Sequence, residues 1–576
     1  MGTFFIAQRS ISSEACERLN QAHMQHGFEL AKRLDVGNFR LFLYRKLDGE
    51  GGLFIETGPS SFACLAGQLL YRGVSGEEAL RGYCADLAQG KLDDQRIIGQ
   101  FALILKDEHG LRLLTDSFGF FHVYYDEAAG IAASSFWALL ELLPKVTVDN
   151  TGVYEYAWNG ATFGATTILK EIRRLPAHAA IVLDGELKLA KAAMSRPLAG
   201  RPIARKLGSY VDEHAERLRR LFGDLAGAFG ERLRVSFSGG YDSRLILAGL
   251  RAAGLRPGLF VYGQDDDTDV RIARQVAAGE QLSCDVIDKS RMMDRDSATA
   301  AMRQKADFVL FDAWRVDGIF DDGSDALDRR KRHDRGRIPL NGSLGEIYRN
   351  FFYIPDRSLT LKGVVDSFFS GYAPSACTDR FSAPGYAAGL IRAFQDALGS
   401  DEERVSRSEI ERLYPLIRGR DWTGRDVTLN LRFGCMFFPF MQAQLIDGTA
   451  DIPVRFKNYG LFEARLIERL APSIARYPSA YGHCFCEPPP LPYRAKTWLT
   501  LFRPSSLRRY SYRLRFANPR PRPSYLGREY LGRLMDCSMP YMRRYFHLEH
   551  LHDPNAFNRV ATMEYIFQKY GAVEPA

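Results

Sequence analysis

The sequence predicts an α/β protein in two large parts, because its hydrophobic pattern changes near residue 200. Before that point, short runs alternate apolar and polar residues and are separated by turn sequences, which is typical of antiparallel strands. After about residue 205, short apolar strands alternate with helical patterns, which predicts a parallel sheet covered by helices. A chain of 576 residues is also too long for a single hydrophobic core.

We expect the first domain to span residues 1–195. Its runs include "NFRLFLYRKL", "QFALILKDEHGLRLLTD" and "HAAIVLDGELKLA", in which "DEHG" and "LDGE" read as hairpin turns. The polar, proline-bearing stretch "SRPLAGRPIARK" follows and is typical of a linker.

The second domain is predicted to span residues 205–500. It begins with the helical pattern "YVDEHAERLRRLFGDLAGAF" and continues as strand "LRVSF", helix "SRLILAGLRAAGL", strand "GLFVYG", helix "DVRIARQVAAGEQL" and strand "CDVID". This order predicts neighbouring parallel strands joined by helices.

Residues 501–576 are expected to form a basic, helical C-terminal extension. Seven arginines and no acidic residue lie between Leu501 and Gly527. Such a stretch suits nucleic acid, anionic lipid or an acidic substrate, but a basic surface segment packed on the preceding domain is the favoured interpretation. Prolines and interleaved aromatic residues argue against a regular helix that recognises nucleic acid within this stretch.

Composition excludes several classes of protein. Hydrophobic residues make up 46% and charged residues 25%, as in ordinary globular proteins. No run approaches the ~20 apolar residues of a membrane-spanning helix, and the N-terminus lacks a secretory pattern. Nine cysteines without a paired framework favour a reducing compartment. We therefore expect a cytoplasmic protein with no membrane partner.

The stretch "VSFSGGYDSR", residues 235–244, stands where a predicted strand ends and a helix begins. At the carboxyl edge of a parallel sheet, this is the position where ligands bind. Gly239 and Gly240 leave backbone N–H groups accessible to phosphate oxygens, and the helix start adds further donors. Ser238 and Ser243 supply hydroxyl donors. We therefore predict that this loop binds the phosphates of ATP.

A carboxylate beside phosphates is explained if Asp242 holds a divalent cation such as Mg²⁺. The alternative is that Asp242 caps the helix after a glycine turn. The lysine-containing phosphate loop of kinases and GTPases is absent. Asp269, which follows the next strand, is expected near the same edge of the sheet. The group His483, Cys484 and Cys486 in "GHCFC" hints at a metal, but no second pair stands at zinc spacing, so a zinc site is not favoured.

"SGGYDS" resembles the pyrophosphate-binding loop of the N-type ATP pyrophosphatases, and in particular the class B, glutamine-dependent asparagine synthetase family. "GQFALILKDEHGLRLLTDSFGFFHVYY" and "TTILKEIRRLPAHAAIVLDG" resemble segments of that family's glutaminase domain. The resemblance extends over about residues 60 to 500. It implies an N-terminal αββα domain of the Ntn-hydrolase type, followed by a Rossmann-like PP-loop synthetase domain.

The family's glutaminase uses a cysteine directly after the initiator methionine, whereas this chain has Gly2. The nearest cysteine, Cys16, lies in a helical pattern. The family's Asn-Gly-Glu element, which grips glutamine, reads Ala66-Gly67-Gln68 here. Without a thiol the domain has no nucleophile, so we expect it to be catalytically silent.

A second phosphate-side motif of the family, Gly-Glu-Gly-Ser-Asp-Glu, resembles "NGSLGE" at residues 341–346. Gly342 is expected in the nucleotide site, while Gly345 stands where the family has a cation ligand. Glu346 is the one acidic residue retained. It is either a metal ligand and catalytic residue or a first-turn carboxylate of the following helix.

"LPYRAKTW" resembles the family's late Arg-x-Lys element. In the family, a substrate carboxylate attacks the α-phosphate of ATP, pyrophosphate leaves, and an amine attacks the acyl-adenylate. The resemblance assigns Lys496 to stabilise charge that develops in both steps, with Arg494 as a phosphate clamp. A surface Arg–Lys pair is the alternative.

The resemblance therefore implies an ATP-dependent carbon–nitrogen ligase that forms AMP, acts on a small-molecule or peptide carboxylate with an amine donor or ammonia, and hydrolyses no glutamine. The family's aspartate-pocket signature is missing, which argues against free aspartate as substrate. Relatives without the N-terminal cysteine include β-lactam synthetases and lasso-peptide cyclases, which implies natural-product or polysaccharide biosynthesis. The alternatives are an ATP-binding pseudoenzyme and a PP-loop enzyme acting on RNA, although a nucleic-acid partner is not expected.

Overall fold

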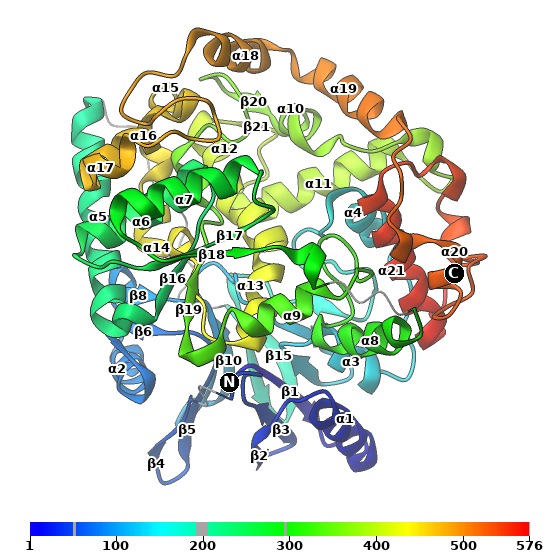
Figure 1. The fold of residues 1–576 in the computed structure, drawn as a ribbon. Helices are drawn as coiled ribbons and strands as arrows, with labels where there is room; N and C mark the ends of the chain where they lie inside the picture. Colours follow the sequence, from blue (N-terminus) through cyan, green and yellow to red (C-terminus); the bar gives the residue numbers. More distant parts are fainter. Residues whose placement is uncertain (50–52, 192–204, 293–296, 575–576) are drawn as a thin grey trace.

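A computed structural model describes residues 1–49, 53–191, 205–292 and 297–574. The fold is mixed α/β, with antiparallel sheets in the N-terminal third and a parallel sheet further along the chain (Figure 1). The expected boundary at residues 195–205 lies almost wholly outside the described residues.

Two six-stranded antiparallel sheets form the N-terminal part. The first has the order β13 (Arg173–Arg174), β11 (Tyr124–Asp126), β12 (Ile131–Ala133), β1 (Thr3–Gln8), β3 (Phe39–Tyr44), β2 (Leu30–Val36). The second has the order β15 (Glu186–Lys191), β14 (Ala179–Asp184), β10 (Gly110–Thr115), β9 (Phe101–Asp107), β5 (Ser61–Gly67), β4 (Leu53–Gly58).

Alternation along the strands divides these sheets into inner and outer faces. Phe5 of β1 stacks on His23 of helix α1 (Ser13–Gln25), which lies beside helix α3 (Phe136–Leu142). On β5, Leu65 packs with helix α2 (Gly76–Ala88) in a separate cluster, whereas Cys64 joins the main core. The order helix, sheet, sheet, helix is therefore compatible with the expected αββα arrangement. A small sheet of β6 (Leu70–Tyr71), β7 (Val74–Ser75) and β8 (Ile97–Ile98) adjoins it.

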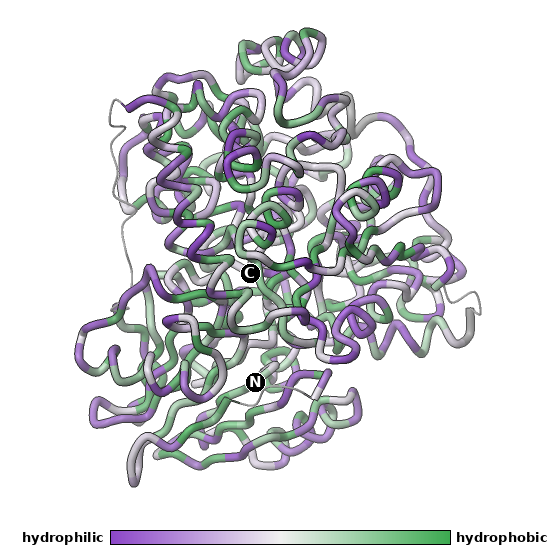
Figure 2. The backbone as a smooth tube through the Cα atoms, turned by 60° about the vertical axis from the view of Figure 1, so that its left-hand side comes forward, coloured by the Kyte–Doolittle hydropathy of each residue, from purple (hydrophilic) through white to green (hydrophobic). Residues whose placement is uncertain are grey.

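The expected hairpin turn at "DEHG" is confirmed, because Asp107 and Gly110 pair across the β9–β10 hairpin. Figure 2 shows that the strands of this part carry long hydrophobic stretches, while many connecting loops at the periphery are hydrophilic. The pattern matches strands that bury side chains and turns that meet solvent.

The expected parallel sheet is also present, and all of its pairs are parallel. Its order is β18 (Cys284–Ile287), β17 (Gly258–Tyr262), β16 (Leu233–Ser236), β19 (Ile338–Leu340). The predicted strands and helices from "LRVSF" to "CDVID" are confirmed as β16, α6 (Tyr241–Ala252), β17, α7 (Thr268–Glu280) and β18. Helix α5 (Leu207–Phe229) precedes them, and α8 (Ser297–Leu310) and α9 (Ser324–Lys331) stand before β19.

A mostly helical region follows the sheet, and its helix α16 (Leu461–Leu470) packs against α5 and α6. This region includes two π-helical segments, of which the longer is η8 (Tyr414–Thr423). The remaining elements are β20 (Leu359–Thr360), α10 (Leu361–Val364), the π-helical η6 (Val365–Phe369), α11 (Ala383–Leu398), β21 (Arg404–Val405), α12 (Arg407–Leu413), α13 (Gly424–Phe433), α14 (Ala443–Ile446), α15 (Val454–Lys457) and α17 (Pro472–Ala475).

The C-terminal region contains α18 (Leu491–Phe502), α19 (Ser505–Ala517), α20 (Arg528–Leu531) and α21 (Pro554–Tyr570). Helices α18 and α19 run along one margin of the molecule (Figure 1). Within the basic stretch, α19 is a regular helix of 13 residues, as expected for a helical extension. Pro504 precedes this helix and Pro519 follows it, so the prolines bracket the helix without interrupting it.

Helix α21 returns to the N-terminal part of the chain. It packs against α4 (Asn150–Asn159), and Val573 pairs with Thr147 in a parallel bridge. Over the described residues, no helix combines the length and the apolar character needed to cross a membrane.

Candidate functional site

The loop that joins β16 to α6 folds back on itself. The backbone N–H of Ser238 donates to Ser243 Oγ at 3.0 Å, and that hydroxyl donates to Ser238 O at 3.0 Å. Gly240 N–H donates to Ser238 Oγ at 3.3 Å. The two serines predicted to bind phosphate therefore also hold the loop in shape.

Gly239 is crowded by neighbouring elements. A Cβ atom there would lie 2.8 Å from Ile272 Cδ1 and 3.0 Å from Ala480. Its N–H donates to Asp269 Oδ1 at 2.9 Å, and its carbonyl accepts from Ala480 N–H at 3.0 Å. The expected approach of Asp269 to this edge is confirmed. A phosphate oxygen that bound Gly239 N–H would have to displace the Asp269 carboxylate.

Asp242 is paired with an arginine that the sequence did not single out. Arg349 Nη2 donates to both carboxylate oxygens of Asp242 at 2.8 Å. The same guanidinium lies 3.5 Å from Glu346 Oε1, and its Nε lies 3.0 Å from Glu463 Oε2. We call Asp242, Glu346 and Glu463 the acidic cluster. Tyr414 Oη donates to Glu346 Oε2 at 2.7 Å and fixes that side chain.

Two glycines make room for Asp242. A Cβ atom at Gly342 would lie 2.9 Å from Asp242 Cβ, and one at Gly345 would lie 2.1 Å from Asp242 Oδ1. The carboxylate of Asp242 therefore occupies the space that a side chain at position 345 would need. The alternative that Asp242 caps α6 has no support, because Gly240 is the N-cap and receives no side-chain capping bond.

The acidic cluster holds three carboxyl groups around one cation, and burial shifts the pKa of two of them, Asp242 and Glu463. Burial raises the pKa of Asp242 to about 6, although Arg349 opposes the shift. Burial and the neighbouring Asp242 raise the pKa of the fully buried Glu463 well above its usual range. Burial therefore favours the neutral form of both carboxyl groups, and the charge of Arg349 favours their ionised form.

Carboxylate oxygens are the ligands that a divalent cation such as Mg²⁺ prefers, but in this structure the Arg349 guanidinium occupies the space among the three carboxyl groups. Asp242 and Glu346 are the partly exposed members of the cluster, whereas Glu463 is buried. Within the described ranges, the one group of three His, Cys, Asp or Glu side chains whose ligand atoms all fall within 4.8 Å of one another is Cys484, Cys486 and Glu487, on the loop after α17. The two thiols are 2.9 Å apart.

Lys496 lies on α18 and its side chain is exposed. Among the contacts recorded for the described residues, none joins its ammonium to the loop or to the acidic cluster. Arg494 lies over the ring of Tyr459 at 5.8 Å. The start of α18 is nevertheless close to the loop. The ring centroids of Tyr493 and His483 lie 5.5 Å apart, and His483 Nε2 lies 3.4 Å from Oη of Tyr241, the first residue of α6.

The N-terminal part leaves no space for a nucleophile at position 2. A Cβ atom on Gly2 would lie 2.9 Å from both Arg45 O and Lys46 Cα. The buried amino group of Met1 donates to Leu65 O at 2.6 Å, and burial lowers its pKa to about 5. Burial raises the pKa of the Cys16 thiol, which disfavours a reactive thiolate.

Arg349, Glu463 and Tyr414 were not predicted from the sequence. Arg349 follows Glu346 by three residues, a spacing at which side chains on one helical turn meet. That spacing was the one local signal available. Glu463 and Tyr414 reach the site from elements far along the chain, which no local pattern reveals.

No protein-family model and no curated protein sequence matches the chain. Among solved structures, the glutamine phosphoribosylpyrophosphate (PRPP) amidotransferase from B. subtilis, complexed with ADP and GMP, is 10% identical with a TM-score of 0.22. That match covers 49% of this chain and 90% of the other. A structure described as the allosteric regulatory enzyme of purine biosynthesis is 9% identical with a TM-score of 0.23, covering 50% of this chain and 80% of its own. Likenesses this low carry no argument about function.

Proposed function

We propose that this protein is an ATP-dependent, amide-forming ligase that adenylates a substrate carboxylate and passes the acyl group to an amine or ammonia. The carrying observation is the glycine loop between β16 and α6, which lies at the carboxyl edge of a parallel sheet and beside the acidic cluster. We propose that it works without glutamine hydrolysis, which the lack of space at Gly2 supports.

In this proposal, backbone N–H groups and the hydroxyls of Ser238 and Ser243 bind phosphate oxygens of ATP. Asp242 and Glu346 would hold Mg²⁺, which offsets negative charge on the phosphates when bound. Arg349 would then move from Asp242 to a phosphate or to Glu463, since one carboxylate cannot serve both cations equally. Lys496 is proposed to stabilise developing charge, which requires its ammonium to approach the loop from α18.

The test is the Asp242→Asn variant, assayed for AMP formation and for ATP–pyrophosphate exchange across candidate carboxylates. We expect at least a 100-fold loss of exchange, because the amide keeps the size of the side chain but loses its charge. Asp265→Asn is a matched control, since Asp265 is exposed and pairs with Arg274 on the surface. Release of ADP in place of AMP by the unaltered protein would contradict the proposal.

One observation favours a second candidate, an ATP-binding pseudoenzyme. The ion pair between Asp242 and Arg349 already satisfies the carboxylate that would hold the cation. ATP binding by calorimetry, without exchange for any carboxylate tested, would support this candidate over the ligase.

A further inference from the structure

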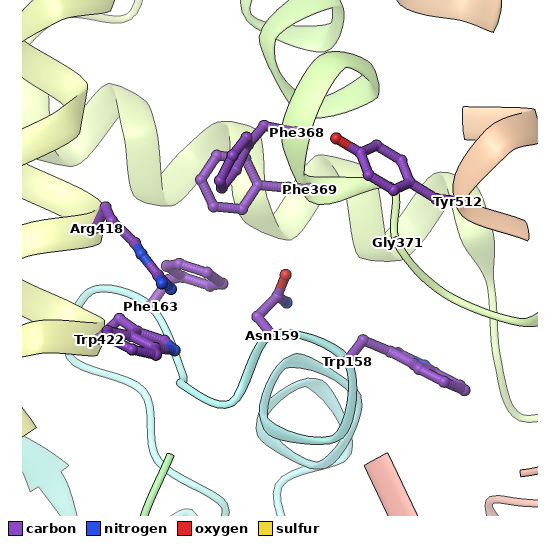
Figure 3. Close-up of a pocket in the computed structure, with 9 residues that line it drawn as sticks. All are labelled: Trp158, Asn159, Phe163, Phe368, Phe369, Gly371, Arg418, Trp422 and Tyr512. Atoms are coloured by element: carbon purple, nitrogen blue, oxygen red, sulfur yellow. The ribbon is translucent and has the colours of Figure 1, made fainter. Parts of the chain in front are cut away.

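A cavity of about 180 Å³ lies where the N-terminal part meets the helical region (Figure 3). Its wall combines the end of α4 and the loop after it with the two π-helical segments η6 and η8, and helix α19. Segments far apart in sequence therefore build one chamber, and part of it belongs to the arginine-rich C-terminal region.

The wall is mainly aromatic. Phe163 and Phe369 lie edge to face with ring centroids 5.6 Å apart, and both are almost fully buried. Trp422 adds an indole face from η8. An apolar cavity of about 150 Å³ holds a benzene ring. The chamber is therefore large enough for one six-membered ring and its substituents.

The side chain of Arg418 brings a positive charge to this aromatic wall. The guanidinium of Arg418 lies 3.5 Å from the centroid of the Trp422 ring. Among the described residues, Arg418 forms no ion pair with a carboxylate. Burial lowers its pKa to about 10, a sign that its charge is poorly solvated there. An anionic ligand would recover that cost, and a guanidinium matches a carboxylate with two parallel hydrogen bonds.

Asn159 adds an acceptor. Its Nδ2 donates to Glu155 O at 3.1 Å and to Tyr386 Oη at 2.6 Å, which fixes the orientation of the amide. Figure 3 shows the amide rising from the end of α4 into the chamber with its oxygen foremost. A carbonyl oxygen in this position suits an N–H or O–H donor on a ligand.

The chamber adjoins the acidic cluster through η8. Tyr414, which donates to Glu346 Oε2, precedes Arg418 by four residues in the same π-helical segment. Glu346 and Tyr414 also influence the charge of Arg418. A carboxylate held at Arg418 would therefore lie on the side of the chamber that faces the proposed nucleotide site.

We propose that this chamber binds a single-ring aromatic carboxylic acid that carries a hydroxyl or amino group, with the carboxylate on Arg418 and the donor on Asn159. A role for this acid as the substrate to be adenylated rests on the proposed function, but its binding does not. A neutral ring would leave the Arg418 charge uncompensated, and a cationic ligand would be repelled by it.

The first experiment is calorimetric titration without ATP, using 4-hydroxybenzoate, its neutral amide 4-hydroxybenzamide, and benzoate. We expect the acid to bind at least tenfold more tightly than the amide, and several-fold more tightly than benzoate. The Arg418→Gln variant should weaken the acid to the level of the amide and leave the amide unchanged. Arg392→Gln is the matched control, because Arg392 is exposed on α11.

Equal binding of acid and amide by the unaltered protein would overturn the inference, and so would the absence of measurable binding or an unchanged affinity in Arg418→Gln. Because the acid–amide comparison needs no variant, misfolding of Arg418→Gln does not remove the test. A subsequent ATP–pyrophosphate exchange assay separates the two proposals. Binding of the acid without exchange keeps the chamber assignment and counts against the ligase.

Discussion

The start of the chain and the glycine loop after β16 are two of the places where the family resemblance implies chemistry, and they differ in what fills the space around them. At Gly2, backbone atoms of Arg45 and Lys46 fill the space where a side chain would extend. At the glycine loop, the carboxylate of Asp242 fills the space that a side chain at the neighbouring Gly345 would need. The first region is closed by neutral backbone, whereas the second retains a concentration of charge.

The difference separates a region whose structure is explained by stable packing from one whose structure is not. A buried backbone contact at Gly2 is ordinary close packing. Three carboxyl groups around Arg349 cost desolvation energy that apolar residues would avoid, and shifted ionisation of this kind gathers at functional sites. The acidic cluster is therefore the stronger candidate for retained function. Three experiments would break or sharpen this comparison.

The largest effect is expected from Gly345→Ala. Its Cβ would lie 2.1 Å from Asp242 Oδ1, so the carboxylate must leave its position. We expect more than a 100-fold loss of ATP–pyrophosphate exchange, and a loss of about 1–3 kcal/mol in the free energy of unfolding from overpacking. Gly227→Ala on α5 is the control, since no heavy atom lies within 4 Å of its Cβ. Full exchange activity in Gly345→Ala would show that the position of Asp242 is unimportant.

A smaller effect is expected from Glu155→Gln, which tests how the N-terminal part handles buried charge. Burial raises the pKa of Glu155 from 4.5 to about 8. The folded state therefore binds more protons than the unfolded state between these values, and stability must fall as pH rises through this window. Removing this group should make stability fall by about 3.5 kcal/mol less between pH 5 and pH 8 than it does in the unaltered protein.

Chemical denaturation at several pH values measures this slope. The amide introduced by Glu155→Gln retains an oxygen that can accept the Phe163 N–H, as Glu155 Oε2 does at 2.9 Å. Parallel slopes for the variant and the unaltered protein would mean that Glu155 is ionised in the folded state.

The smallest effect is expected from Gly2→Cys, which places a cysteine where the glutaminase that the sequence resembles has one. Crowding by Arg45 O and Lys46 Cα should cost about 1–2 kcal/mol of stability. No glutamine hydrolysis should appear, because the Met1 amine remains buried against Leu65 O. Gly208→Cys, in open space, is the control. Ammonia release from glutamine by Gly2→Cys would mean that the domain retains a working glutamine site.

Local pattern predicted the elements on which this comparison depends. The alternation of β9 and β10 and the sequence of elements from β16 to β18 follow from periodicity and turn residues, which act over a few positions. The helical character of the C-terminal extension was also predicted, but its boundaries at α19 depend on where the prolines stand. Pro504 occupies the start of the helix, where a missing N–H costs nothing.

The site was less predictable than the fold. Ser238, Gly239, Gly240, Asp242 and Ser243 form one loop that a motif reveals. Arg349 contacts Asp242 across 107 positions of sequence, and Glu463 arrives from α16. Such contacts arise from packing of distant helices, and a single sequence does not encode them in any local spacing. The roles predicted for Glu346, Gly342 and Lys496 stay predictions.

The bridge between Val573 and Thr147 has a practical meaning for anyone who dissects this molecule. Val148 N–H donates to Val573 O, and Val573 N–H donates to Val146 O, both at 2.9 Å. The residues just beyond α21 are therefore hydrogen-bonded to the N-terminal part of the chain. Helix α21 also supplies Thr562 Oγ1 to Ile319 N–H at 2.9 Å. Truncation of the chain after residue 500 would remove the contacts to residues 146–148 and to Ile319 at once. A domain exchange would therefore have to include α21 and the residues that follow it.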